Sequence, residues 1–554
     1  MATAGRILRN VKVAMRDGSR LSATVFLPEG DGPFPAVLVR TAYNRIGFTG
    51  QEFTARGLAL VVQDCRGRYD SEGEWYPFIH EADDGLDTLT WLQQQPWCDG
   101  RVGMFGDSYL AATQFLLATT GTTGLTALNP RFMAGDCWKR AYYCDGAFSL
   151  GLTWSWLSFE CSARTSEAAL MPLFDVGAIL RQSPLLTLDE ASGAGEVQAY
   201  RDYVSHAQYG DLWRAINVRE RLGEVRAPML LIGGWYDYYA GETFLNYTAL
   251  REGAASPELR DVHRVLIGPW THGMSGSSVL GEVDFGPAAL AENDITLRWL
   301  SALLTGGEPR DVLPAPIRLF VMGVNEWRDE REWPLARTRW TEYHLRAGGR
   351  LTPEGPGAEA PDEYDYDPRD PVPTLGGNHS IGPYNPGLYE MARPGPFDQR
   401  PIEAREDVLL YTSDPVDEDT EVTGPVTVTL YGASSAPDTD FVARLTDVHP
   451  DGRSVNVTEG VLRARFREGV WGEPELMVPG EVGAFRIDLQ ATSHVFRRGH
   501  RLRLQVTSSS FPLWDCNRNT GADPATDTGG QVARQTVYHD SSRPSSVRLP
   551  VVPR

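Results

Sequence analysis

The residue whose setting most directly suggests catalysis is Ser108, in segment 106–110 (Gly-Asp-Ser-Tyr-Leu). A short apolar run, 102–105, precedes this segment, and an apolar, helix-like run, 111–118, follows it. A strand, a tight turn and a helix form a nucleophile elbow, which lifts a serine hydroxyl clear of the backbone and directs helix N–H groups toward the attacked atom. Leu110 stands where the usual Gly-x-Ser-x-Gly pattern ends in glycine, so a plain turn with an exposed serine remains an alternative.

A catalytic serine needs a general base, and the base needs an acid that orients it. In α/β-hydrolases these residues follow the order Ser, Asp or Glu, His, with each residue placed after a strand of the sheet. Asp237 follows the apolar run Met229–Ile232, and His272 follows Val265–Ile267. We therefore predict the triad Ser108, Asp237 and His272. A turn carboxylate and a satisfied core imidazole are the alternatives for the last two residues.

Other acids and histidines fit this order less well. Asp107 adjoins the nucleophile and cannot easily fold back to hold a histidine beside its own neighbour. His263 precedes its strand, which would place it at the opposite end of the sheet, and His80 lies before the elbow.

Two hydrogen-bond donors should stabilise the oxyanion that forms during acyl transfer. The backbone N–H of Tyr109, directly after the serine, is the first candidate. The second donor usually comes from the loop after an early strand, here 41–45, which has no Gly-Gly pair. The hydroxyl of Tyr43 is therefore a candidate donor, and a tyrosine packed at a strand end is the alternative.

The composition excludes several classes of partner. A net charge of −21 over 554 residues, with a pI near 5.0, argues against binding to nucleic acid or to an anionic membrane. The six cysteines show no Cys-x-x-Cys spacing, so we expect a reduced, cytoplasmic chain without a zinc site. The N-terminus has no apolar signal region, and no run of about eighteen apolar residues predicts a membrane span.

The pattern of apolar residues changes twice along the chain. Strand-like and helical runs alternate up to the elbow, which is typical of a parallel sheet covered on both faces. Residues 138–222 are rich in aromatic residues and leucine at helical spacing, which predicts an inserted, all-helical cap. Strand character then returns, and a Gly- and Pro-rich passage, 348–401, reads as a linker or a long loop. Beyond it a period of two predicts a jelly-roll β-sandwich.

We predict three domains from this organisation. They are an α/β-hydrolase catalytic domain from residues 1–137 and 226–333, a helical cap from 138–225 and a jelly-roll β domain from 334–554.

With these residues in place, the chain resembles the family of cocaine esterase, X-Pro dipeptidyl-peptidases and α-amino-acid ester hydrolases. The resemblance implies the same three domains and Tyr43 as the side-chain oxyanion donor. Relatives commonly read Gly-x-Ser-Tyr-x-Gly, so the departure here is Ala111 at the last glycine. The matching segments are 41–43, 64–68, 71–73, 106–109, 234–237, 268–272, 284–286, 438–441, 509–512 and 517–521.

Several aromatic residues are candidates for the substrate pocket, although aromatic residues at helical spacing more often belong to the core. The candidates from the cap and from the segment beside the acid are Trp154, Trp156, Phe159, Tyr238 and Tyr239, and the resemblance adds Phe441. Segment 64–68 (Asp-Cys-Arg-Gly-Arg) is expected to brace loops beside the site through buried ion pairs and to take no part in the chemistry.

The sequence thus predicts a serine carboxylesterase that acts on small-molecule esters or amides without a metal or an organic cofactor. An X-Pro dipeptidyl-peptidase or an α-amino-acid ester hydrolase (acylase) is the first alternative. It would need a carboxylate cluster that binds a substrate ammonium, for which Glu160 and Asp145 are candidates. A non-catalytic jelly-roll binding protein is the second alternative, and a homo-oligomer is left open.

Overall fold

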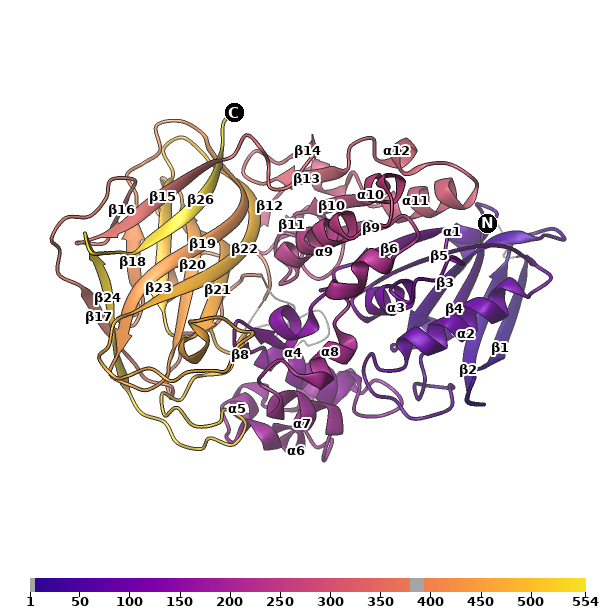
Figure 1. The fold of residues 1–554 in the computed structure, drawn as a ribbon, viewed down its shortest axis with the longest axis horizontal. Coiled ribbons are helices and arrows are strands. Elements are labelled where there is room, and N and C mark those ends of the chain that lie inside the picture. Colours follow the sequence, from indigo (N-terminus) through magenta and orange to yellow (C-terminus); the bar gives the residue numbers. More distant parts are fainter. Residues whose placement is uncertain (1–4, 379–392) are drawn as a thin grey trace.

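The computed structural model describes residues 5–378 and 393–554. The N-terminal part of the chain is built on a ten-stranded sheet (Figure 1). Its order is β1-β2-β4-β3-β5-β6-β9-β10-β13-β14. The strands from β4 to β13 in this order run parallel, and β1, β2 and β14 pair antiparallel at the two edges. In chain order the strands are β1 (Arg6–Ala14), β2 (Arg20–Leu27), β3 (Phe34–Thr41), β4 (Ala59–Asp64), β5 (Cys98–Asp107), β6 (Ala127–Arg131), β9 (Leu230–Gly234), β10 (Arg264–Gly268), β13 (Ile317–Val321) and β14 (Glu326–Glu330).

Helices cover this sheet because its central strands are apolar on both faces. Every residue of β4, β9 and β10 is buried, as expected for parallel strands that lie between two layers of helices. The predicted doubly covered sheet is therefore confirmed. The longer helices are α2 (Glu81–Gln93), α3 (Tyr109–Ala118), α9 (Ala240–Glu252) and α11 (Ile295–Leu304), and the shorter elements are η1 (Arg45–Gly47), α1 (Gln51–Thr54), α10 (Pro257–Asp261), β11 (Val279–Leu280), β12 (Val283–Asp284), η7 (Pro287–Leu290) and α12 (Pro309–Val312).

A group of short helices is inserted between β6 and β9. The prediction of an all-helical cap is wrong at one place, because β7 (Tyr143–Cys144) and β8 (Ala147–Phe148) form a small hairpin. Its turn residues, Asp145 and Gly146, have φ values of 42° and 93°, which suit a tight hairpin turn. The helical elements are η2 (Trp138–Tyr142), α4 (Leu150–Ser155), η3 (Trp156–Glu160), η4 (Ala168–Leu173), α5 (Val176–Leu180), η5 (Leu185–Thr187), α6 (Leu188–Ala191), α7 (Gln198–Ser205), α8 (Asp211–Ile216) and η6 (Arg219–Glu224).

The last third of the chain forms a largely antiparallel β structure, as its period of two predicts. It packs against the first sheet and the cap (Figure 1), and an isolated bridge joins Met322, just after β13, to His494. Its elements are β15 (Arg339–Arg346), β16 (Arg350–Thr352), β17 (Asp362–Tyr366), α14 (Arg400–Glu403), β18 (Leu409–Thr412), β19 (Thr420–Ser434), β20 (Asp440–Val448), β21 (Ser454–Arg463), η8 (Ala464–Phe466), β22 (Gly483–Phe496), β23 (Arg501–Thr507), β24 (Ala533–Asp540), β25 (Arg543–Pro544) and β26 (Ser546–Val552).

The Gly- and Pro-rich passage at 348–401 is more than a linker or a loop. It contributes β16 and β17, and β17 pairs antiparallel with β24 over five residue pairs. Residues 379–392 of this passage lie outside the described residues. We keep the three domains, with boundaries near residues 137, 225 and 333, as a proposal that agrees with where these elements begin and end.

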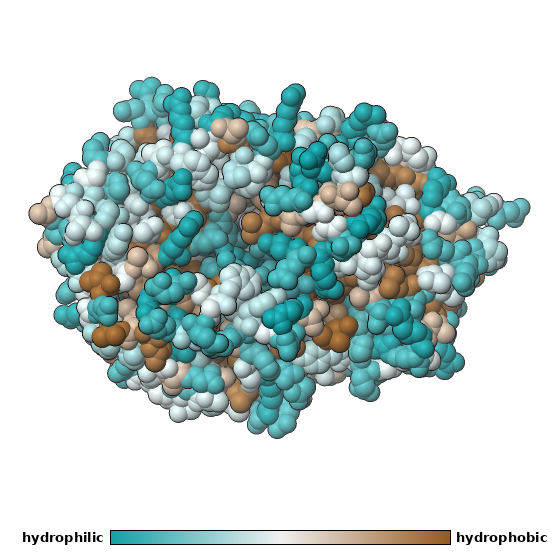
Figure 2. Space-filling model, viewed as in Figure 1, coloured by the Kyte–Doolittle hydropathy of each residue, from teal (hydrophilic) through white to brown (hydrophobic). Residues whose placement is uncertain are grey.

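The outer surface is largely hydrophilic on the face that Figure 2 shows. Smaller hydrophobic areas lie between the hydrophilic residues. Among the described helices, none combines the length and the apolar character needed to cross a bilayer.

Candidate active site

Ser108 lies in a strained turn between β5 and α3. Its φ and ψ are 57° and −121°, a conformation that costs a non-glycine residue about 1–3 kcal/mol and that recurs at functional sites. Its backbone N–H donates to the carbonyl of Arg131 at 3.0 Å, which ties the turn to β6. The side chain is half-buried at the carboxyl end of a central strand, where α/β sheets bind their ligands.

The turn depends on Gly106. A Cβ atom at this position would lie 2.3 Å from Cβ of Leu110, and the φ of Gly106 is +150°. The close approach of strand and helix therefore requires a glycine at 106 while a leucine occupies 110. Ala111 is fully buried beside it, so the elbow forms without the last glycine of the family pattern.

Asp237 and His272 meet after neighbouring strands, β9 and β10. The distance from Nδ1 of His272 to Oδ1 of Asp237 is 3.1 Å, and both side chains are buried. Burial raises the pKa of the Asp237 carboxyl, and the charge and hydrogen bond of His272 act in the opposite direction. The ring of Tyr238 stacks on the imidazole, with 5.5 Å between centroids and 12° between planes. The imidazole is thus fixed at one edge by a carboxylate and on one face by a phenol.

One cavity brings most of the predicted residues together. Tyr43, Ser108, Tyr109, Trp156, Tyr238, Tyr239 and His272 all line it. Sequence reasoning missed several other lining residues, because they come from loops and short helices without a shared pattern. These residues are Phe78, Met133, Tyr142, Leu152, Ser155 and Met171.

Three predicted pocket residues are instead part of the hydrophobic packing. The indole N–H of Trp154 donates to the carbonyl of Leu188 at 2.8 Å, and its ring packs against Phe159. Phe441 is fully buried in the jelly roll, against Phe485. None of the three is among the described residues that line the cavity around Ser108.

The two expected oxyanion donors lie at the same cavity. The hydroxyl oxygen of Tyr43 accepts a hydrogen bond from the indole N–H of Trp156 at 2.9 Å, which fixes the hydroxyl. Tyr109 is the first residue of α3, and a backbone N–H in the first turn of a helix has no partner within the helix. The two tyrosine rings meet edge to face, 6.3 Å apart.

A buried chain of polar contacts anchors the residue after the serine. The hydroxyl of Tyr109 donates to Oε1 of Glu81 at 2.7 Å, and Oε2 of Glu81 lies 2.6 Å from Nη1 of Arg40. All three side chains are buried, and burial raises the pKa of the Tyr109 phenol well above its usual value. The sequence gives no signal for Arg40 and Glu81, because their contacts join β3, α2 and α3.

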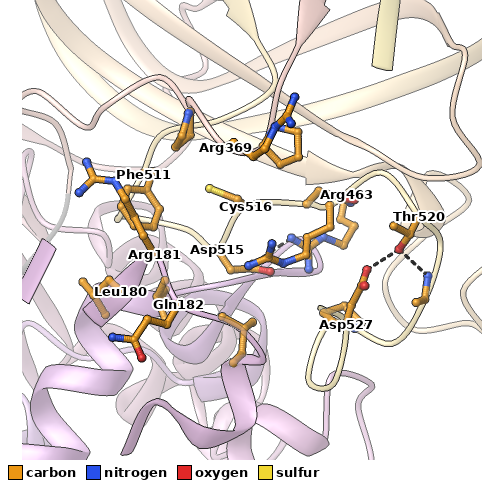
Figure 3. A pocket seen from close by; sticks show the side chains of 18 of the residues that line it. Leu180, Arg181, Gln182, Arg369, Arg463, Phe511, Asp515, Cys516, Thr520 and Asp527 are labelled. Atoms are coloured by element: carbon orange, nitrogen blue, oxygen red, sulfur yellow. Dashed lines mark hydrogen bonds and ion pairs between the residues drawn. The ribbon is translucent and has the colours of Figure 1, made fainter. Parts of the chain in front are cut away.

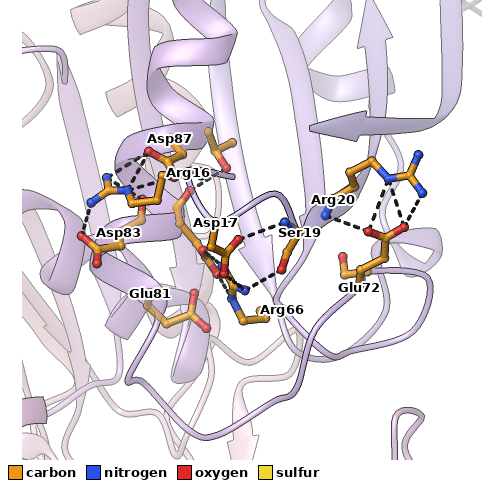
Figure 4. A network of polar contacts seen from close by, with 12 residues as sticks. Arg16, Asp17, Ser19, Arg20, Arg66, Glu72, Glu81, Asp83 and Asp87 are labelled. Carbon is orange, nitrogen blue, oxygen red and sulfur yellow. Dashed lines mark hydrogen bonds and ion pairs between the residues drawn. The ribbon is translucent and has the colours of Figure 1, made fainter. Parts of the chain in front are cut away.

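Segment 64–68 braces the loops around the site, as predicted. Arg66 forms a 2.6 Å ion pair with Asp84 and another with Asp17, part of the network in Figure 4. Asp64 pairs with Arg45, and Arg68 donates to carbonyl oxygens both on the loop after β3 and in the cap. The segment thus connects the hydrolase sheet with the cap.

A second cavity lies between the cap and the jelly roll (Figure 3). Several arginines line it, but they are engaged locally. Arg463 contacts both Asp440 and Asp515 at 2.9 Å, and Arg181 lies over the ring of Phe511. Ser108 and His272 are not among the described residues that line this cavity.

A serine in an elbow and a buried Asp–His pair, on a doubly covered parallel sheet, define an α/β-hydrolase of the serine type. The chain matches the family model of the X-Pro dipeptidyl-peptidase (S15 family) over residues 17–274. It matches the X-Pro dipeptidyl-peptidase C-terminal non-catalytic domain over residues 312–548.

Individual relatives agree with these family matches. The chain is 36% identical to the cocaine esterase of Rhodococcus sp. (strain MB1 Bresler) over 99% of both chains. It is 28% identical to a putative serine esterase of Mycobacterium tuberculosis (strain CDC 1551 / Oshkosh), over 90% of this chain and 89% of that one. The structure of an α-amino acid ester hydrolase superposes with a TM-score of 0.85 at 25% identity, covering 100% of this chain and 97% of the other. The chain therefore belongs to the cocaine esterase and X-Pro dipeptidyl-peptidase (S15) family and is a serine hydrolase.

Proposed function

We propose that the protein cleaves carboxylic esters through an acyl-enzyme on Ser108. His272 takes the proton of the serine hydroxyl, and Asp237 holds the imidazole in the required tautomer. The observation that carries this assignment is the buried contact between His272 and Asp237 at the cavity that also contains Ser108. Water, activated by the same imidazole, then releases the acyl group.

The backbone N–H of Tyr109 and the hydroxyl of Tyr43 are the proposed oxyanion donors. The indole N–H of Trp156 donates to the hydroxyl oxygen of Tyr43, which positions this hydroxyl at the cavity that also contains Ser108. Both donors act on charge that develops in the transition state, so they are expected to influence kcat more than KM.

The lining of the cavity favours neutral esters with apolar or aromatic groups. Its described residues are mostly aromatic and aliphatic, and they include one carboxylate, Glu160, which accepts a 2.6 Å hydrogen bond from Ser166 and whose pKa is raised by burial. Asp145, the other candidate for an ammonium site, pairs instead with Arg140 and Lys139. Recognition of a substrate ammonium by a carboxylate cluster therefore has less support than an ester substrate.

A fluorophosphonate probe tests the nucleophile. We expect the wild-type protein to become covalently labelled and to hydrolyse phenyl acetate, and we expect Ser108→Ala to lose both properties. Ser205→Ala, at an exposed serine of the cap that is not among the described residues lining this cavity, is the matched control and should keep both. Labelling of Ser108→Ala at the wild-type rate would contradict the assignment, and faster hydrolysis of an Ala-Pro anilide than of phenyl acetate would favour a peptidase.

Tyr43→Phe tests the side-chain donor. We expect kcat for phenyl acetate to fall by about 10²–10³-fold with little change in KM, since the loss of one oxyanion donor costs about 3 kcal/mol of transition-state stabilisation. Tyr76→Phe, which removes a hydroxyl that bonds Asp202 away from the cavity lining, should leave kcat nearly unchanged. An increase in KM at constant kcat would instead indicate that Tyr43 only packs against the substrate.

A further inference from the structure

A group of imidazoles surrounds one buried carboxylate in the jelly roll, apart from the catalytic cavity. Asp447 lies near the end of β20, His449 follows that strand, and His500 directly precedes β23. One ligand atom from each of these three residues lies within 4.8 Å of those of the other two. None of the three is among the described residues that line the cavity around Ser108.

The sheet fixes two of these side chains. Strands β20 and β23 pair antiparallel, with Asp447 opposite Leu502 and Val448 opposite Arg501. This register brings His500 beside Asp447, and Nδ1 of His500 lies 2.8 Å from Oδ1 of the carboxylate. His449 approaches from the turn between β20 and β21, with its Nε2 atom 3.9 Å from Oδ2.

The carboxylate has a further imidazole partner. Nε2 of His494, on β22, lies 2.9 Å from Oδ2 of Asp447. Residues that hydrogen-bond a metal ligand in this way hold the ligand in a fixed orientation. The nearby cation Arg453 is paired with Asp451 at 2.8 Å, so part of its charge is compensated outside the cluster.

We propose that Asp447, His449 and His500 bind one divalent transition-metal ion of the zinc type. Two imidazoles and a carboxylate suit such an ion. Tetrahedral bonds of about 2.0–2.1 Å set the ligand atoms roughly 3.3 Å apart. Nδ1 of His500, 2.8 Å from Oδ1, would therefore move slightly outward, and Nε2 of His449, 3.9 Å from Oδ2, would move inward. His449 is the most exposed of the three and lies on a turn, so it is the ligand that adjusts most. Water completes the coordination.

The ion would act in stability rather than in ester cleavage. It would link the turn between β20 and β21 to the segment between β22 and β23. His494, which contacts the same carboxylate, also bridges to Met322 of the hydrolase domain. A metal that binds only the folded state stabilises it by an amount that grows with the logarithm of its free concentration relative to Kd.

Cobalt(II) and zinc(II) test this site in the full-length protein after removal of metals with a chelator. We expect one equivalent of Co²⁺ to give the visible absorption of a low-symmetry site with nitrogen ligands, to be displaced by Zn²⁺, and to raise the thermal midpoint. His449→Ala should weaken the binding of Zn²⁺ at least 10-fold, as judged by calorimetry, while the hydrolysis of phenyl acetate continues. His206→Ala, at an exposed histidine of the cap, is the matched control and should bind like the wild type.

Either of two results would overturn the proposal. One is the absence of a one-equivalent Co²⁺ spectrum with the wild-type protein, and the other is equal Zn²⁺ affinity in the wild type and His449→Ala. His449→Gln keeps a polar side chain and serves as a second variant if the alanine variant folds poorly. Because esterase activity is recorded separately, failure of the metal site and failure of the catalytic assignment can be told apart.

Discussion

Asp237→Asn is expected to lower kcat for phenyl acetate by about 10⁴-fold, the size of effect seen when the acid of a serine triad becomes an amide. Oδ1 of Asp237 lies 3.1 Å from Nδ1 of His272. In the proposed mechanism it accepts the Nδ1 proton, so that Nε2 is the base for the serine. An asparagine can present an N–H group to Nδ1, and the imidazole would then hold its proton on Nε2, the nitrogen proposed to act as the base. Because substrate binding does not use this contact, KM should change little.

Steady-state measurements of kcat for variants of two histidines, His272 and His80, complete this test. His272→Ala should cause a loss of kcat at least as large as that of Asp237→Asn, whereas His80→Ala, at an exposed side chain, should keep wild-type kcat. His263 cannot replace His272, because its Nδ1 atom accepts from the backbone N–H of Met229 at 3.3 Å and burial lowers its pKa to about 3. A loss of less than 10-fold in Asp237→Asn would show that the imidazole does not depend on this carboxylate.

The architecture could be predicted from the sequence because its signals are local. Buried strands such as β4 and β10 are continuous apolar runs, and the elbow combines a glycine, a serine and a helix start within a few residues. The order of the triad then follows from the rule that functional residues lie after parallel strands. To predict the Asp237–His272 pair, only this rule and the positions of two strands were needed.

The parts that could not be predicted depend on contacts between residues far apart in the chain. Trp154 and Trp156 cannot be told apart in the sequence, because both lie in the same aromatic-rich helical segment. In the structure, Trp154 donates to the backbone of α6, whereas Trp156 donates to Tyr43 at the cavity. The hairpin in the cap is four residues of strand in a helical segment, too short for a periodic pattern. The contact between Arg40 and Glu81 likewise joins two elements that the sequence separates.

Glu81→Ala is expected to lower the free energy of unfolding of the hydrolase domain by about 3–5 kcal/mol, because it leaves the buried guanidinium of Arg40 without its 2.6 Å carboxylate partner. Glu72 provides a matched control in the same region, and Figure 4 labels both glutamates. Its 2.6 Å ion pair with Arg20 is exposed, so Glu72→Ala should cost at most about 1 kcal/mol. Denaturant unfolding followed by tryptophan fluorescence measures the difference between the two variants.

The same variant tests whether the buried ion pair positions the elbow. Loss of Glu81 also removes the acceptor of the Tyr109 hydroxyl, and the backbone N–H of that residue is a proposed oxyanion donor. We therefore expect kcat of the folded Glu81→Ala protein to fall while KM changes little, and we expect Glu81→Gln, which keeps an acceptor for Tyr109, to recover part of the activity. If Glu81→Ala and Glu72→Ala shift the unfolding midpoint equally, the contact with Arg40 does not stabilise the fold; if kcat stays at the wild-type value, Tyr109 is held by the helix alone.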